Sequence, residues 1–221
     1  QRRGRGEVIG VPNAAAFGTG LLVLALAATS PADDLADSSF TGHMIQHMVI
    51  LVIASPLLAM GGAGLVLTMA LPHRARRWQA RIRNSAVLRW SRQPLHRSMI
   101  GGLAFTGVLW SWHLPALYVL AERRELVHAG EHLSYVAVGV LLWSAVLTPE
   151  RHRLSGPLAF LLLACVGMAG AALGAVLTFA PGPLYPPEAF AANASALADQ
   201  QLAGGLCLAH LAGHQLDGGA R

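Results

Sequence analysis

The sequence predicts an all-α fold, a polytopic bundle of transmembrane helices that forms a single domain over residues 1–221. Two properties of the composition predict it. Hydrophobic residues make up 54% of the chain and charged residues only 12%, and the mean hydropathy is +0.49. Soluble globular chains contain about 25% charged residues, so this profile indicates a surface that faces lipid. The third observation is a series of apolar runs of about 20 residues, the length that a helix needs to cross a hydrocarbon core.

Six apolar runs predict six membrane spans that alternate in direction along the chain. They lie near residues 11–30, 43–71, 98–120, 127–148, 156–180 and 198–212. The first run is long enough for a true span, and the polytopic remainder of the chain favours a span over a signal segment. The last run is the weakest, because His210 and His214 interrupt it. The chain ends at Arg221 soon afterwards, which leaves open whether a seventh span follows.

The distribution of arginine predicts the orientation of these spans. All sixteen basic residues are Arg, and thirteen of them gather before the first span and in the second and fourth loops. These residues are Arg2, Arg3, Arg5, Arg74, Arg76, Arg77, Arg81, Arg83, Arg89, Arg92, Arg97, Arg151 and Arg153. The odd-numbered loops contain only Arg123 and Arg124, and acidic residues occupy the first of them. By the positive-inside rule the amino terminus and the even-numbered loops are cytoplasmic.

The second loop, residues 73–97, is predicted to form an amphipathic segment on the cytoplasmic surface. Basic runs can bind nucleic acid. Here, however, Trp78, Ile82, Leu88 and Trp90 interleave with the arginines, a pattern typical of a helix that lies on an anionic membrane surface. We therefore expect membrane lipid as the partner of this loop, and no nucleic acid.

Five of the ten histidines lie near the outer ends of three neighbouring spans. His43 and His47 begin the second span from the outside, and His113 lies near the outer end of the third. His128 and His132 begin the fourth span from the outside. Ionisable side chains within a membrane span are costly and usually functional. The sequence therefore predicts a site in the outer leaflet where five imidazoles meet.

The spacing of these histidines favours a metal site. His43 and His47 are four residues apart, as are His128 and His132, so each pair shares one helical face with Cβ atoms about 5–6 Å apart. Two imidazoles on one face hold a metal ion when a facing helix completes the ligand shell. Imidazole suits copper, zinc and iron. The predicted metal ligands are thus His43, His47, His113, His128 and His132.

Four further residues are possible additional ligands or neighbours of the ligands: Met44, Met48, Glu131 and Asp199. The two methionines flank the first histidine pair, and thioether sulfur is a soft ligand suited to Cu(I), although core packing is the simpler explanation of both. A ligating histidine usually donates its second N–H to a carboxylate or carbonyl, which makes Glu131 and Asp199 plausible acceptors.

Two smaller patterns concern packing. Tyr118 and Tyr135, with Trp110 and Trp112, fit an aromatic belt at the membrane interface better than a cofactor site. Gly170 and Gly174 have the spacing of a GxxxG motif, which predicts close packing of helices either inside the chain or in a homodimer.

Four strings, in this order, resemble motifs of the CtaG family of bacterial integral membrane proteins, which are associated with assembly of caa3-type cytochrome c oxidase. The strings are TGHMIQHMVILVIASPLLAMG, WSWHLPALY, LVHAGEHLSYVAVGVLLW and ADQQLAGG, within residues 40–206. The resemblance implies a bacterial plasma-membrane protein of about seven spans that helps supply copper to the oxidase. It also implies that His43, His47, His113, His128 and His132 bind the metal, with Asp199 beside them. The chain departs from the family pattern in its polar final segment, HLAGHQLDGGAR.

We therefore expect a copper-binding assembly factor rather than an enzyme. It would hold copper, as Cu(I), on the extracytoplasmic side of the membrane. An extracytoplasmic donor would supply the ion, and a subunit of a heme-copper cytochrome c oxidase would receive it. Clustered imidazoles in a protected cup would release the ion by ligand exchange, without redox turnover.

Three other functions stay open. His128, Glu131 and His132 fit the pattern H-x-x-E-H, in which two histidines hold zinc and the glutamate acts as base, so the chain would be an intramembrane zinc metalloprotease. A b-type haem between histidines of two helices is the second alternative. The third is a metal-free transporter or scaffold whose histidines relay ions.

Overall fold

The structure, a computed structural model, describes residues 10–29, 32–83, 85, 90, 93–147, 154–190 and 195–216. Part of the predicted orientation depends on residues outside these ranges, namely Arg2, Arg3, Arg5, Arg89, Arg92, Arg151 and Arg153. The described residues form helices and no strands. The helices are α1 (Val11–Ala27), α2 (Ala32–Ser38), α3 (Phe40–Met48), η1 (Val49–Ala54), α4 (Ser55–Met60), α5 (Ala63–Ala70), α6 (His73–Arg83), α8 (Pro94–Trp112), α9 (Pro115–Arg123), α10 (Glu125–Leu147), α11 (Gly156–Phe179), η3 (Pro187–Ala189) and α12 (Ala196–Leu216).

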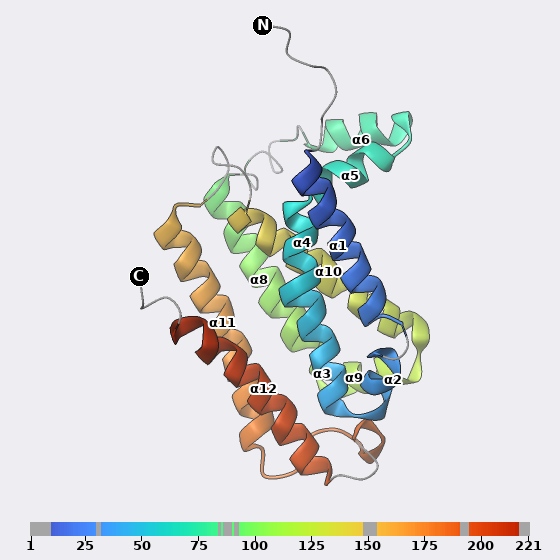
Figure 1. The fold of residues 1–221 in the computed structure, drawn as a ribbon, viewed down its shortest axis with the longest axis vertical. Coiled ribbons are helices and arrows are strands. Elements are labelled where there is room, and N and C mark those ends of the chain that lie inside the picture. Colours follow the sequence, from blue (N-terminus) through green and yellow to red (C-terminus); the bar gives the residue numbers. More distant parts are fainter. Residues whose placement is uncertain are drawn as a thin grey trace, which may run out of the picture.

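The long helices pack as an antiparallel bundle (Figure 1). The continuous helix α3–η1–α4 contacts α1 on one side and α10 on the other, α10 packs on α8, and α11 pairs with α12. The arginine-rich helix α6 lies at one end of the bundle, whereas α2, α9 and the start of α3 lie at the opposite end (Figure 1). The all-α membrane bundle predicted from the sequence is confirmed.

Fewer helices than the six predicted spans are long and apolar enough to cross a membrane on their own. Three described helices meet this test: Phe40–Met60, Glu125–Leu147 and Gly156–Phe179. The bent pair Pro94–Trp112 and Pro115–Arg123 becomes a fourth if it is counted as one span. Helix α1 is apolar but has only 17 residues. The predicted run 43–71 is divided, because Gly62 adopts a left-handed conformation with φ 73° that separates α4 from α5.

A π-helical segment, η1, lies in the middle of the second predicted span, directly before Ser55 and Pro56. Proline has no N–H and its ring clashes with the carbonyl four residues earlier, so a wider turn relieves the strain. Two side chains bond to the carbonyls of this turn. The Ser55 hydroxyl donates to Ile50 O at 2.8 Å, and the indole N–H of Trp143 in α10 donates to Leu51 O at 3.0 Å. The segment is therefore tied to the neighbouring helix.

A sharp bend separates α8 from α9. The two helices meet at 73° across His113 and Leu114, and Leu114 is extended, as expected for a residue that precedes a proline. Pro115 then begins the new helix, a position where its missing N–H costs nothing. As a result α9 does not continue along the bundle but turns across its end (Figure 1).

The first turn of α3 is held by a residue from the last helix. The Asp199 carboxylate accepts hydrogen bonds from the backbone N–H groups of Phe40, at 3.0 Å, and Thr41, at 3.2 Å, and from the Thr41 hydroxyl. Ser39 also caps this turn by accepting from the Gly42 N–H. Acidic groups at a helix amino terminus satisfy free N–H groups and complement the helix dipole. This cap positions the helix that carries His43 and His47.

One of the predicted GxxxG glycines, Gly174, packs closely against another helix of the chain. Gly174 of α11 faces Gly204 of α12 so closely that a Cβ on Gly174 would lie 2.9 Å from Gly204 O. The motif predicted close packing either inside the chain or in a homodimer, and this contact is packing inside the chain.

Candidate metal centre

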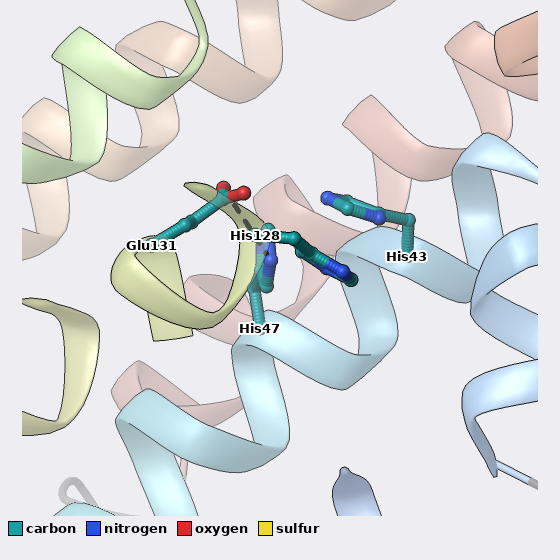
Figure 2. Close-up of side chains that lie close together, drawn as sticks. All are labelled: His43, His47, His128 and Glu131. Atoms are coloured by element: carbon teal, nitrogen blue, oxygen red, sulfur yellow. Dashed lines mark ion pairs between the residues drawn. The ribbon is translucent and has the colours of Figure 1, made fainter. Parts of the chain in front are cut away.

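Three histidines and one glutamate come together at the end of the bundle that carries α9. His43, His47, His128 and Glu131 each offer one ligand atom, and these atoms all lie within 4.8 Å of one another. Figure 2 shows the four side chains pointing toward one another from α3 and α10. His43, His47 and Glu131 are buried, and His128 is half-buried. We call this group the His/Glu cluster.

The helical spacing explains how the cluster forms. His47 lies four positions after His43, so their rings stand on one face of α3 with centroids 4.2 Å apart. The His128 ring of α10 stacks against His43 at 5.4 Å. Glu131 lies three residues after His128 and therefore on the same face of α10. Two neighbouring helices that run in the same direction thus present two side chains each to a common point.

Several ligand atoms of the cluster are buried without a hydrogen-bond partner among the described residues. They are Nε2 of His43, Nδ1 of His47, Nε2 of His128 and Oε2 of Glu131. A buried polar atom that lacks a partner costs about 1–3 kcal/mol, and such atoms are normally paired. A metal ion at the centre of the cluster would satisfy these atoms together. The donor set of three imidazoles and one carboxylate therefore fits a transition-metal cation.

Glu131 is the acidic residue among the four side chains of the cluster. Its Oε1 lies 3.5 Å from Nε2 of His47, and the two side chains are 2% and 4% exposed. A carboxylate buried in a low-dielectric interior needs a counter-charge. A bound cation would supply it. The sequence predicted Glu131 as a possible additional ligand or a neighbour of the ligands, and the structure places it among the candidate ligands.

His132 lies next to the cluster but outside the group of four. Its ring centroid is 4.4 Å from that of His128 and 5.4 Å from that of His47, and the side chain is half-buried. The five predicted ligands therefore do not all converge on one point. His132 extends the row of imidazoles along α10.

His113 contacts Met44 rather than the other histidines. It ends α8, where its Nδ1 donates to Leu109 O at 2.7 Å, and its Nε2 lies 3.1 Å from the Met44 sulfur. Both side chains are buried. Of the two methionines predicted as possible ligands, Met44 forms this pair and Met48 is half-buried in α3.

Asp199 caps the first turn of α3, a role that the sequence analysis did not predict. Both of its carboxylate oxygens serve the amino terminus of α3, as described above. It therefore supports the cluster through the position of α3. His210 and His214 lie in α12, and their side chains are outside the described part of the structure.

The predicted interfacial belt is wrong for two of its residues. Tyr118 and Tyr135 are 3% and 1% exposed, and both pack on the histidines. The ring centroids of Tyr118 and His43 are 5.3 Å apart, and those of Tyr135 and His47 are 4.6 Å apart. These aromatic rings wall the cluster on two sides, because the bend before α9 turns Tyr118 inward.

Two residues near the site were missed by the sequence analysis. Glu122, which the sequence places in an external loop, has its Oε1 3.5 Å from Nδ1 of His43. Its spacing of four residues after Tyr118 was the available signal. Tyr185, from the segment between α11 and α12, donates its hydroxyl to His113 O at 2.9 Å. Burial raises the pKa of Tyr185, so the phenol keeps the proton that it donates.

Comparison with known proteins agrees with the motifs. A family model described as cytochrome c oxidase caa3 assembly factor matches residues 1–212, which includes every helix that contributes to the cluster. A search of curated proteins and of solved structures gave no match.

Proposed function

The chain belongs to the cytochrome c oxidase caa3 assembly factor family, and from this membership we propose that it binds copper at the His/Glu cluster and passes the ion to an apo subunit of the oxidase. The copper is cargo, and the protein performs no chemical turnover on it. One observation carries the proposal. Three imidazoles and a carboxylate converge in a buried position with ligand atoms that have no hydrogen-bond partner among the described residues.

The donor set supports copper as the cargo. Imidazole binds Cu(I), Cu(II) and zinc, and in the usual affinity order of divalent ions Cu(II) binds most strongly. We propose Cu(I) as the transported state, because a small number of imidazole ligands suits it and Met44 offers a soft sulfur one contact away, beside His113. His132 would serve as an exchangeable ligand beside His128. Such exchange lets the ion leave without any change of oxidation state.

The same geometry argues against the two metal-based alternatives. In the H-x-x-E-H interpretation His128 and His132 hold zinc and Glu131 remains free as a base. Here Glu131 instead lies beside His47 of another helix. A b-type haem requires a porphyrin between two axial imidazoles, but the ligand atoms of four side chains lie within 4.8 Å of one another. This arrangement suits a single ion.

We propose that the His/Glu cluster faces the extracytoplasmic side of the bacterial plasma membrane. Helix α3, which carries His43 and His47 of the cluster, lies at the end of the bundle opposite to α6 (Figure 1). Helix α6 contains Arg74, Arg76, Arg77 and Arg81, and its Trp78 is 68% exposed. A helix of this kind would lie on the anionic cytoplasmic leaflet. An extracytoplasmic copper donor and the oxidase subunit would then meet the protein at the α9 end.

Metal analysis of the detergent-purified protein tests the proposal. We expect close to one copper per cluster after growth with copper and zinc, and loss of most of it in His47→Ala and His128→Ala. His73→Ala is the matched control, because His73 is exposed in α6. Copper retained in both cluster variants would show that the copper site lies elsewhere in the protein. A wild-type protein without copper would refute the delivery function, and zinc or a Soret band would then select one of the alternatives.

A further inference from the structure

Helix α9 closes the end of the bundle over the His/Glu cluster. The 73° bend before Pro115 turns it across the bundle, and one face of it points to the histidines. On this face Tyr118 packs against His43 at 5.3 Å and against Tyr185 at 4.6 Å. These contacts leave His43 only 1% exposed. An ion that reaches the cluster from outside must therefore pass α9.

Glu122 connects the buried cluster to the outside. It lies one helical turn after Tyr118, and its Oε1 is 3.5 Å from Nδ1 of His43. The Glu122 side chain is 31% exposed, whereas that of His43 is 1% exposed. Through this contact the solvent-exposed carboxylate of Glu122 meets the buried imidazole of His43.

A cavity of about 220 Å³ lies on the outer side of this contact. It is lined by Tyr118, Val119, Glu122 and Arg123 of α9 and by Pro186 and Ala189 from the segment that follows α11. A site of this size admits water molecules or one inserted side chain. We call it the Glu122 cavity.

We propose that the Glu122 cavity is the port through which copper enters and leaves the His/Glu cluster, with Glu122 as the transient ligand that passes the ion to and from His43. This inference rests on the proposed copper-binding function. It adds a route and a residue that neither the family membership nor the histidine pattern assigns.

The chemistry of the ligands gives the port its direction. A carboxylate oxygen is a hard ligand that holds Cu(I) weakly, whereas imidazole holds it better. An ion attracted by Glu122 would therefore move inward to His43 when the cluster is empty. For outward transfer, a partner must place a stronger ligand for Cu(I) in the cavity, and a thiolate or thioether side chain meets this need. The ion exchanges one ligand for another at each step, and its oxidation state does not change.

The test compares the kinetics of copper exchange in two variants with the same chemical change. Glu122→Gln removes the charge at the port, and Glu125→Gln removes an exposed charge three residues further on, outside the cavity lining. Purified protein in detergent is loaded with Cu(I), and release to a water-soluble Cu(I) chelator is followed by stopped-flow absorption. Copper content at saturation is measured on the same samples.

We expect loading and release in Glu122→Gln to be slower than in the wild type by about tenfold, the lower end of the range for residues that support metal ligands. Glu125→Gln should exchange copper at the wild-type rate, and Glu122→Asp should recover part of the lost rate. Equal rates in Glu122→Gln and Glu125→Gln would overturn the port while leaving the copper function standing. A wild-type protein that takes up no copper would overturn both.

Discussion

Glu131 of α10 and His47 of α3 approach each other to 3.5 Å in the interior of the bundle, where both side chains are almost completely shielded from solvent. The pair joins the two helices that supply the His/Glu cluster. A buried carboxylate beside neutral imidazoles is expensive unless a cation accompanies it. The relationship therefore leads to a test of the charge on residue 131.

Replacement of Glu131 by Gln should weaken copper binding by about 10–100-fold, because the substitution keeps the shape of the side chain and removes its charge. A competition titration of the purified protein with a Cu(I) chelator would measure the change. Glu125→Gln, at the exposed start of the same helix, should leave the affinity at its wild-type value. An unchanged affinity in Glu131→Gln would show that the carboxylate is not part of the copper site.

Replacement of Asp199 by Ala should destabilise the protein by about 1–2 kcal/mol, since the first turn of α3 loses its acceptors. Thermal unfolding in detergent, followed by circular dichroism, would report the loss. Gln201→Ala is the control, because Gln201 is an exposed neighbour in α12. If Asp199 instead acted only on a metal-bound histidine, its replacement would change copper binding and leave the unfolding temperature of the metal-free protein untouched.

The contact between Met44 and His113 predicts that sulfur is absent from the copper site at rest. The Met44 sulfur lies 3.1 Å from the His113 ring, and His113 is not among the four residues whose ligand atoms converge. Met44→Leu should therefore keep the wild-type copper content. X-ray absorption at the copper edge should show nitrogen and oxygen neighbours. Zinc–sulfur bonds in proteins are about 2.3 Å long, and a copper–sulfur bond of similar length is expected if sulfur binds the ion. Such a distance, present in the wild type and lost in Met44→Leu, would place the methionine in the site.

Two substitutions in α10 should have opposite effects on stability. A Cβ on Gly139 would collide with Ser55 of α4, so Gly139→Ala should cost about 1–3 kcal/mol. A Cβ on Gly130 would meet no atom within 4 Å, and Gly130→Ala should stabilise the helix by up to about 1 kcal/mol. Unfolding temperatures of the two variants would give the sign of each effect. A Gly139→Ala protein as stable as the wild type would show that α4 and α10 do not pack as closely as described.

Thiol labelling of intact cells tests the proposed orientation. The native Cys165 and Cys207 would first be replaced by Ala, and a single cysteine would then be introduced at Ser195 or at Ser85, both exposed. A membrane-impermeant reagent should label Ser195→Cys in intact cells, and Ser85→Cys only after lysis. The reverse pattern would place the His/Glu cluster on the cytoplasmic side.

The local geometry of the site could be predicted from the sequence because helical periodicity determines it. The spacing of His43 and His47 placed both rings on one face, and the alternation of spans brought His128 to the same depth. Periodicity does not determine how far a helix continues. The bend at Leu114 was therefore not predicted, and neither was the inward position of Tyr118 and Glu122 that follows from it.

The roles of the acidic residues were harder to predict than their positions. The sequence placed Glu131 and Asp199 at the correct end of the bundle, but two kinds of partner compete for a carboxylate there. Asp199 lies opposite the free N–H groups at the start of α3 and bonds to them. Glu131 lies beyond the first turn of α10, where the backbone N–H groups are already bonded within the helix. Its carboxylate therefore faces the imidazoles instead.

The cap that Asp199 places on α3 also sets an order of events during synthesis. Phe40 and its capping carboxylate are 159 residues apart in the sequence. A ribosome delivers the early helices to the membrane well before α12 emerges, so α3 lacks its acceptor until α12 has been made. We expect the nascent chain to bind copper weakly during that interval, because α3, which carries His43 and His47, still lacks its cap. If the protein binds copper as proposed, loading would be reserved for chains in which α12 has been made, and a product terminated before α12 would not withdraw copper from the supply.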